Sequence, residues 1–411
     1  MDEVHTADPD TLQGQLQRGR GLGALAVARS PESARPVVFD CVCRDPRWDH
    51  QVEERDLYYG RLILENGWPL DTVRDHLFSD EDAEDQDEWR TGLALAVLGV
   101  LVRASRGDAR ELLRRYIVEG WNWRWALDDL SAARRPELLD SLDELVLRRF
   151  SDDELAAEVH HGWGPWDFWA SRQPRVRAAF EARAARPSSP KPEDLVPKSN
   201  AELIELVRSG GHARRVAAIA LGDRGDPILL DLAEELLSNH PSGVPGVVSA
   251  LLRLPGEEVV GRARAWVREA RPYADVGIWI LSERGDERDI DPLIGDLEAS
   301  LATSNWSGAV QPINGLGRLG ARRAAPLILQ AWHVSEYSYL RPRALDALLA
   351  LAPSQATALA EEGLWDCEEL ARQRSAQVAS LTDSTRPRLE ALSEDELERE
   401  DVRTSAAARL R

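Results

Sequence analysis

The sequence predicts an all-α fold, an α-solenoid of stacked helical hairpins with no substantial β-sheet. Three observations lead to this prediction. A helical period recurs in the C-terminal half, and Gly or Pro interrupts it at each step. Strand signals are scarce, because aromatic residues make up only 6% of the 411 residues and no period-two run lies beside a hairpin turn. Repeats of two helices are typical of a solenoid, in which each hairpin buries its apolar face only against its neighbours.

The period is read from leucines that end apolar stretches and precede a Gly or Pro break. These leucines stand at positions 221, 252, 281, 316 and 349, in steps of 31, 29, 35 and 33 residues. After two of the breaks, Pro227 and Pro292 open the next stretch. Proline is tolerated there because the first N–H groups of a helix have no partner within the helix. Each step therefore predicts a pair of helices.

The spacing of Ala, Leu and Val and the Gly or Pro between the helices resemble HEAT repeats, in particular the short bacterial repeats of phycobilisome-lyase-like proteins. The resemblance covers residues 200–380. It implies the solenoid fold. It suggests a chromophore-handling or lyase-like role only by analogy, because a repeat fold does not determine an activity.

The N-terminal half is also predicted to be helical, with a longer step. The candidate helix pairs cover residues 50–66 with 70–78, 89–106 with 109–119, and 123–132 with 136–150. Gly67 and Gly107, which interrupt the first two pairs, lie 40 residues apart. That step is compatible with longer repeats of the same type.

Composition divides the chain into four parts. Residues 1–186 are a Trp-rich helical-repeat region, and residues 187–199 are a linker with four prolines. Residues 200–380 hold the repeats described above. Residues 381–411 are charged and contain few large apolar side chains, which predicts a tail or a capping helix.

Composition and charge predict a soluble cytoplasmic protein. Lys and Arg total 51 against 71 Asp and Glu, so the net charge is −20, which opposes binding to nucleic-acid phosphate. The longest apolar stretch, residues 92–102, is too short to cross a bilayer, and the acidic N-terminus lacks the pattern of a signal peptide. Three cysteines fit a reducing compartment. We expect no membrane partner, and the oligomeric state stays open.

No metal site and no cofactor are expected. Cys41 and Cys43, with His50 nearby, lack the second ligand pair that structural zinc requires. Two apolar helix positions account for these cysteines. The sequence contains no motif for nucleophilic catalysis and no Gly-rich phosphate loop.

Tryptophan is the unusual residue type, since nine of the 14 tryptophans precede the linker. Two clusters combine tryptophan with carboxylates. Their candidate partner-binding residues are Trp121, Trp125, Asp128, Asp129, Trp163, Trp166, Asp167 and Trp169. On helices, Trp121 would share a face with Trp125, and Trp166 with Trp169. Two interpretations stay open: the rings fill the core between hairpins, or they line a groove for a peptide, a cation or a base.

The spacing Trp125-x-x-x-Asp129 also resembles an element of the HEAT-like alkylpurine DNA glycosylases. In those enzymes a Trp and an Asp one helical turn apart flank the damaged nucleotide, and the carboxylate stabilises cationic character at the sugar. The resemblance implies a catalytic role for Asp129 with Trp125 beside it, and it extends to no other residue. Such enzymes also need a cationic face for DNA, which a net charge of −20 opposes.

We therefore expect a non-catalytic scaffold or adaptor that binds a protein or peptide partner on an acidic, aromatic-lined solenoid surface. Stacked repeats present extended surfaces suited to large interfaces. The negative charge favours a partner rich in Lys and Arg. The alternative is the alkylpurine DNA glycosylase that would use Trp125 and Asp129.

Overall fold

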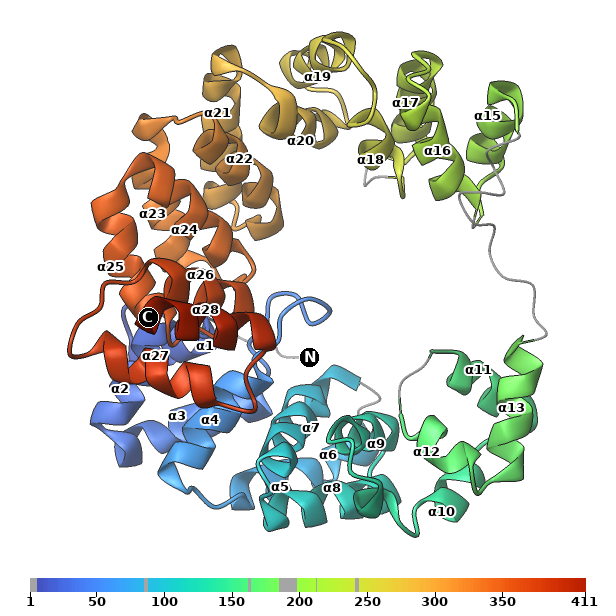
Figure 1. Cartoon of the computed structure of the whole chain (residues 1–411), viewed down its shortest axis with the longest axis vertical. Coiled ribbons are helices and arrows are strands. Elements are labelled where there is room, and N and C mark those ends of the chain that lie inside the picture. Colours follow the sequence, from blue (N-terminus) through green and yellow to red (C-terminus); the bar gives the residue numbers. More distant parts are fainter. Residues whose placement is uncertain (1–5, 85–87, 162–163, 185–197, 212, 241–243) are drawn as a thin grey trace. The chain divides into compact units, whose positions relative to one another are not determined.

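A computed structural model describes residues 6–84, 88–161, 164–184, 198–211, 213–240 and 244–411. The protein is an all-α solenoid of paired helices, and these described residues contain no strand (Figure 1). The predicted fold class is therefore confirmed. Within the same residues, no helix combines the length and the apolar character that crossing a bilayer requires.

The chain divides into two compact units. Unit 1 comprises Met1–Arg186, Glu336–Tyr339 and Thr357–Arg411, and unit 2 comprises Pro187–Ser335 and Leu340–Ala356. The first boundary falls where the linker 187–199 was predicted, although residues 187–197 lie outside the described residues. The residues after Thr357, which the sequence placed in the repeats and in a tail, belong to unit 1.

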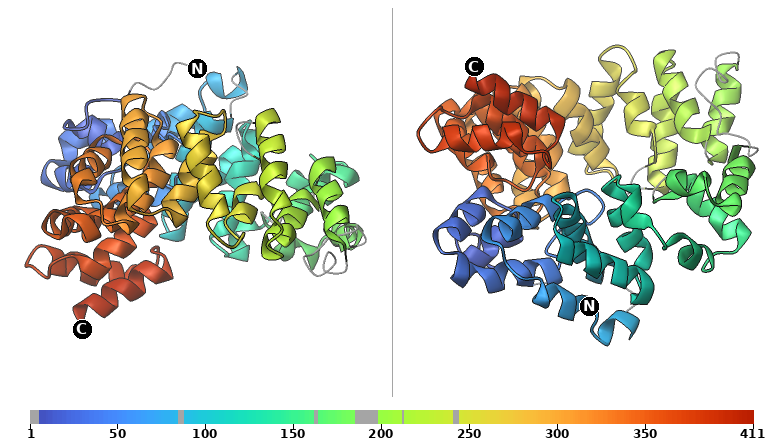
Figure 2. Two further views of the ribbon diagram at one scale, coloured as in Figure 1. Left: turned by 90° about the horizontal axis from the view of Figure 1, so that it is seen from above. Right: turned by 60° about the horizontal axis from the view of Figure 1, so that its bottom comes forward.

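Unit 2 is a series of helix pairs. Its helices are α15 (Asn200–Ser209), α16 (Ala213–Asp223), α17 (Ile228–Asn239), α18 (Val247–Leu251), α19 (Glu258–Arg268), α20 (Ala274–Arg284), α21 (Ile290–Ala302), α22 (Trp306–Arg318), α23 (Ala325–Val334), α24 (Leu340–Leu351) and the start of α25 (Pro353–Gly363). From α16 to α24, successive even-numbered helices pack on one another, and each packs on the odd-numbered helix that precedes it. Figure 2 shows these paired helices in green, yellow and orange.

Local sequence accounts for these helix ends. Ser199 and Glu202 form a capping box at the start of α15, in which the Ser199 side chain accepts from the Glu202 amide and the Glu202 carboxylate accepts from the Ser199 amide. Gly225 follows α16 with a φ of +66°, a left-handed conformation that glycine adopts without strain. The break predicted after Leu221 is therefore a turn at a glycine with positive φ.

Unit 1 packs around a central helix, α7. Its helices are α1 (Leu12–Gln17), α2 (Gly21–Arg29), α3 (Pro31–Cys43), α4 (Asp56–Asn66), α5 (Asp71–Leu77), α6 (Glu81–Glu84), α7 (Glu88–Arg103), α8 (Gly107–Glu119), α9 (Trp123–Ala132), α10 (Asp143–Leu147), α11 (Asp152–His161), α12 (Trp166–Ala170), α13 (Pro174–Ala184), the end of α25, α26 (Glu369–Val378), α27 (Thr385–Glu394) and α28 (Glu400–Leu410). The apolar stretch 92–102 lies in α7, which contacts α3, α4, α5, α8 and α9. A helix surrounded in this way is apolar on nearly all sides.

The N-terminal and C-terminal helices of unit 1 lie next to one another (Figure 1), and buried charged groups join them. Arg20 donates hydrogen bonds of 2.9 and 3.0 Å to the two carboxylate oxygens of Glu362. The carboxylate of Glu398 accepts from Arg372 at 2.7 and 2.8 Å and from Arg61 at 3.0 Å. A buried charge without its partner is costly, so these pairs hold the two ends of the chain together.

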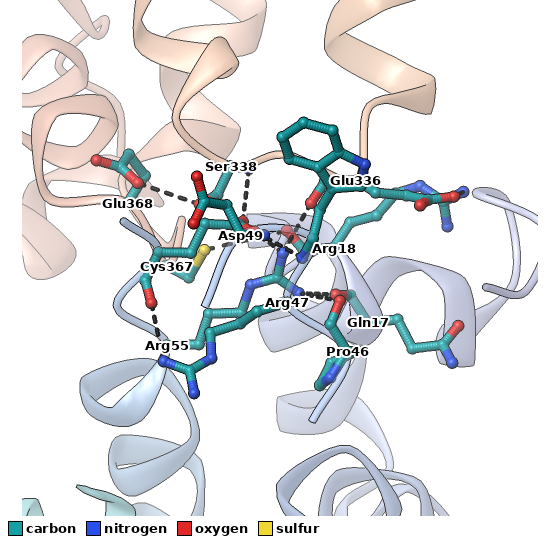
Figure 3. A network of polar contacts seen from close by, with 12 residues as sticks. Gln17, Arg18, Pro46, Arg47, Asp49, Arg55, Glu336, Ser338, Cys367 and Glu368 are labelled. Atoms are coloured by element: carbon teal, nitrogen blue, oxygen red, sulfur yellow. Dashed lines mark hydrogen bonds and ion pairs between the residues drawn. The ribbon is translucent and has the colours of Figure 1, made fainter. Parts of the chain in front are cut away.

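A second polar network joins the residues before α4 to the segment Glu336–Tyr339, which lies between α23 and α24 (Figure 3). Arg55 donates to the Glu53 carboxylate at 2.6 Å and to the carbonyl oxygen of Glu336 at 2.7 Å. Glu53 also accepts from the amide of Ser338 at 2.8 Å. Because Arg55 and Glu53 are buried, these bonds explain why the segment Glu336–Tyr339 belongs to unit 1.

Candidate functional site

Helix α9 carries the first predicted cluster. It begins at Trp123 and packs on α7 and α8. Trp121 therefore lies before the helix, where its side chain is 38% exposed and its amide donates to the Asp82 carboxylate at 3.0 Å. The expected pairing of Trp121 with Trp125 on one helix face is wrong, because the extended residue Gly120 ends α8 and the new helix starts three residues later.

Trp125 is half-buried and lies against α7. A Cβ atom added to Gly92 would lie only 2.4 Å from the Trp125 ring, so this helix contact requires glycine. The Trp89 ring lies edge to face with Trp125, with centroids 5.1 Å apart, and the His50 ring lies 5.0 Å from Trp89 on the other side. Three aromatic rings from different parts of unit 1 are thus neighbours.

Asp129 follows Trp125 by one helical turn and faces α7 as well. A Cβ atom on Gly99 would lie 3.2 Å from a carboxylate oxygen of Asp129. Positions 92 and 99 are seven residues apart, so both glycines lie on one face of α7. The i, i+4 spacing predicted for Trp125 and Asp129 therefore places both side chains along the same face of α7.

The carboxyl groups of α9 are in an unfavourable environment for a negative charge. Burial, and then the nearby charges of Asp56 and Asp128, raise the pKa of Asp129 to about 8. Burial and the charge of Glu158 raise the pKa of Asp128 to about 7. Among the described residues, no group donates a hydrogen bond to either carboxylate.

Asp56, at the start of α4, adds a further carboxylate near Asp129. It forms one long contact of 3.5 Å with Arg103, which ends α7. Burial raises the pKa of Asp56, and Arg103 only partly offsets this effect. We call the residues Asp56, Trp89, Arg103, Trp125 and Asp129 the Asp129 cluster.

The second predicted cluster lies mainly in the core. Trp166 and Trp169 on α12 are 3% and 0% exposed, and their ring centroids lie 5.6 Å apart. Trp166 also packs edge to face on Phe150. Burial of these two rings leaves no surface for a partner, so they cannot serve as the predicted binding residues. Asp167 is exposed on the same helix, and Trp163 lies outside the described residues.

Sequence reasoning missed Trp89 and Asp56 as members of this cluster. Trp89 stands alone in the sequence, and Asp56 looks like an ordinary helix-end charge. The one sequence signal for this cluster is the presence of Gly92 and Gly99 inside an apolar helix. Glycine at such positions indicates that another part of the protein approaches the helix closely.

No group of three or more His, Cys, Asp and Glu side chains in the described part of the chain is arranged to hold a metal ion. Cys41 and Cys43 lie on α3 as free cysteines, and burial raises the pKa of both thiols to about 12. A thiol with such a pKa is a poor nucleophile and a poor metal ligand.

A comparison of this chain with protein-family models, curated proteins and solved structures finds no match. Any function must therefore be argued from the chemistry of the Asp129 cluster itself.

Proposed function

We propose that the protein is a non-catalytic HEAT-type scaffold that binds a Lys- or Arg-rich segment of a protein partner at the Asp129 cluster. The observation that carries this proposal is the unpaired state of the half-buried carboxylate of Asp129, one helical turn after Trp125, whose ring packs on that of Trp89.

The electrostatics of the cluster favour a cationic ligand. After burial, the charges of Asp56 and Asp128 raise the pKa of Asp129, and Arg103 forms a single contact of 3.5 Å with Asp56. A Lys or Arg side chain placed there would stabilise the ionised carboxylates of Asp128 and Asp129, which accept no hydrogen bond within the described residues. The net charge of −20 adds long-range attraction for a basic partner.

The aromatic rings support the same ligand. A cation over a Trp ring gains about 0.5–2 kcal/mol, depending on how far it is desolvated. Trp125 is held rigidly against Gly92, so little side-chain entropy remains to be lost when a ligand binds. Trp121, which is largely exposed, and Asp167 remain further candidate contacts on the surface of unit 1.

The geometry favours the glycosylase alternative less. Trp125 and Asp129 do share one face of α9, as that alternative requires. However, the carboxylate must be ionised to stabilise a cationic sugar, and the pKa of Asp129 at about 8 leaves most molecules protonated near neutral pH. Phosphate groups of DNA would raise this pKa further.

Removing the Asp129 cluster is expected to weaken the binding of a basic peptide. A fluorescein-labelled oligo-arginine peptide, measured by fluorescence anisotropy, should bind the full-length protein and should bind Trp125→Leu or Asp129→Asn about tenfold more weakly, the loss of about 1.4 kcal/mol. Affinity should also fall as salt is added, because charge attraction is screened.

The matched control is Asp153→Asn, which removes one exposed carboxylate from α11. It should bind the peptide as the wild type does. Equal affinities for the wild type and both cluster variants would refute the proposal. Release of a base from duplex DNA that contains 7-methylguanine, abolished by Asp129→Asn, would instead establish the glycosylase.

Peptide affinity is expected to rise with pH. A cation binds the ionised carboxylates, and Asp129 ionises with a pKa of about 8 beside Asp56, Asp128, Arg103 and Arg47. The dissociation constant of the oligo-arginine peptide should therefore fall several-fold between about pH 6 and about pH 9. Arginine stays charged over this range. Asp129→Asn should flatten the profile, and an unchanged slope in this variant would contradict the role of Asp129.

A further inference from the structure

A second combination of an exposed Trp ring with carboxylates lies in unit 2. Trp279 on α20 is 40% exposed, a fraction close to that of Trp121. Asp275 and Glu283 lie one helical turn before and one turn after it, and both are exposed. Residues at i, i+4 and i+8 share one face of a helix and here extend over about 12 Å. We call these three residues the Trp279 face.

The carboxylates of the Trp279 face have no cation beside them. Within the described residues, neither Asp275 nor Glu283 forms an ion pair or a side-chain hydrogen bond. The charge of Asp275, after the larger effect of burial, raises the pKa of the neighbouring Asp296 on α21 to about 6. Asp296 therefore adds to the negative potential of this face.

The charged groups next to this face have partners of their own. The carboxylates of Asp286 and Asp289, which follow α20, both accept hydrogen bonds from Arg264. The adjacent arginines are also engaged elsewhere. Arg284 donates to the carbonyl oxygens of Leu254 and Gly256, and Arg318 donates to the carbonyl oxygen of Ser282.

We propose that the Trp279 face is a second docking site, which takes a Lys or Arg side chain of a basic protein segment over the Trp279 ring and between the two carboxylates. Charge complementarity identifies the occupant, because the face carries the two carboxylates of Asp275 and Glu283, with Asp296 nearby, and no cation of the described residues pairs with Asp275 or Glu283. Two effects supply the binding energy: the partner covers the exposed part of the Trp279 ring, and the ring attracts the cation. Nucleic acid and anionic lipid are repelled by the same charges.

This site is formed by helices of unit 2 alone, and the Asp129 cluster by elements of unit 1. The protein therefore presents two independent sites for basic segments, and one long basic partner that reaches both would gain avidity. The inference goes beyond the proposed function, because the Trp279 face requires no residue of the Asp129 cluster.

The test is a titration calorimetry experiment with the full-length protein and a short oligo-arginine peptide. The wild type should bind two peptides per chain, and Trp279→Ala and Asp275→Asn/Glu283→Gln should each bind one. Trp125→Leu should also bind one, and addition of Trp279→Ala to it should abolish binding. Since Trp279 is only 40% exposed, its replacement also removes buried ring surface and should lower the urea midpoint, so far-ultraviolet circular dichroism must show that the variant is folded at the temperature of the titration.

The matched control is Glu257→Gln/Glu258→Gln, which removes two exposed carboxylates from the start of α19 in the same unit. It should keep the stoichiometry of the wild type. Unchanged stoichiometry and affinity in Trp279→Ala would overturn the second site. Analytical ultracentrifugation gives a second check. If the wild type is a dimer and Trp279→Ala is a monomer, the Trp279 face binds a second copy of this chain, and the proposal of a basic partner segment is overturned. The Asp129 cluster is tested separately by Trp125→Leu, which should lose one of the two bound peptides whatever the result for Trp279→Ala.

Discussion

Replacing Glu398 by glutamine is expected to lower the free energy of unfolding by about 3–5 kcal/mol, because the substitution leaves the buried guanidinium group of Arg372 without a counter-charge. Arg61 loses one of its two carboxylate partners and keeps Asp395. Glu398 is 4% exposed. Its two oxygens accept from Arg372, and one of them also accepts from Arg61. Arg61 lies on α4 and Arg372 on α26, so the loss affects the contact between the two ends of the chain.

Urea denaturation of the full-length protein near neutral pH, followed by far-ultraviolet circular dichroism, measures this change. Glu396→Gln is the matched control, since Glu396 is exposed two residues away and its replacement should change the free energy by at most about 0.5 kcal/mol. Equal effects of the two substitutions would show that the buried pairs do not stabilise unit 1.

The same carboxylate gives a pH signature. Burial raises the pKa of Glu398, but the hydrogen bonds and charges of Arg372 and Arg61 outweigh burial and lower the pKa to about 2. A lowered pKa in the folded state stabilises the protein above the unfolded pKa of about 4.3, and this stabilisation is lost as the pH falls towards 2. The wild type and Glu398→Gln should therefore become more similar in stability across this acid range.

Replacing Gly222 by valine is expected to destabilise unit 2 by about 3 kcal/mol, at the upper end of the cost of overpacking. A Cβ atom at this position would lie 2.4 Å from the carbonyl oxygen of Ala250 and 3.1 Å from its Cα atom. Both are backbone atoms, so the contact between α16 and α18 would have to open. A rotation of a side chain cannot relieve the clash.

Gly261→Val is the matched control, because Gly261 lies within α19 and has open space where a Cβ atom would be. Thermal unfolding monitored by circular dichroism should show a lower midpoint for Gly222→Val and little change for Gly261→Val. Similar midpoints for the two variants would mean that helix propensity, rather than the close approach of α16 to α18, decides the result.

The role of glycine illustrates how far the sequence reaches. Gly225 was predicted to interrupt a helix, and it does so with a positive φ. Gly222, three residues earlier, lies inside α16 and permits contact with the next even-numbered helix. In the sequence, Gly222 and Gly225 both look like helix breaks. Only the position of the neighbouring helix shows that Gly225 makes a turn and that Gly222 permits a close approach.

The candidate site divides in the same way. The i, i+4 spacing correctly placed Trp125 and Asp129 on one face, because both lie in a single helix. The pattern could not show that Trp166 and Trp169 are buried, since aromatic side chains at helical spacing occur in cores and in grooves alike. Trp89 and Asp56 come from other helices, so no local spacing connects them with Asp129.

By itself, the sequence determined that this protein is a series of paired helices, because apolar periodicity and Gly or Pro breaks act over a few residues. Tertiary structure alone decided which carboxylates have partners and which ends of the chain meet. Arg20 and Glu362 are separated by 342 positions and leave no mutual trace in local patterns. Charge pairing depends on distance in space and on burial, and neither is encoded in the spacing of residues along one helix.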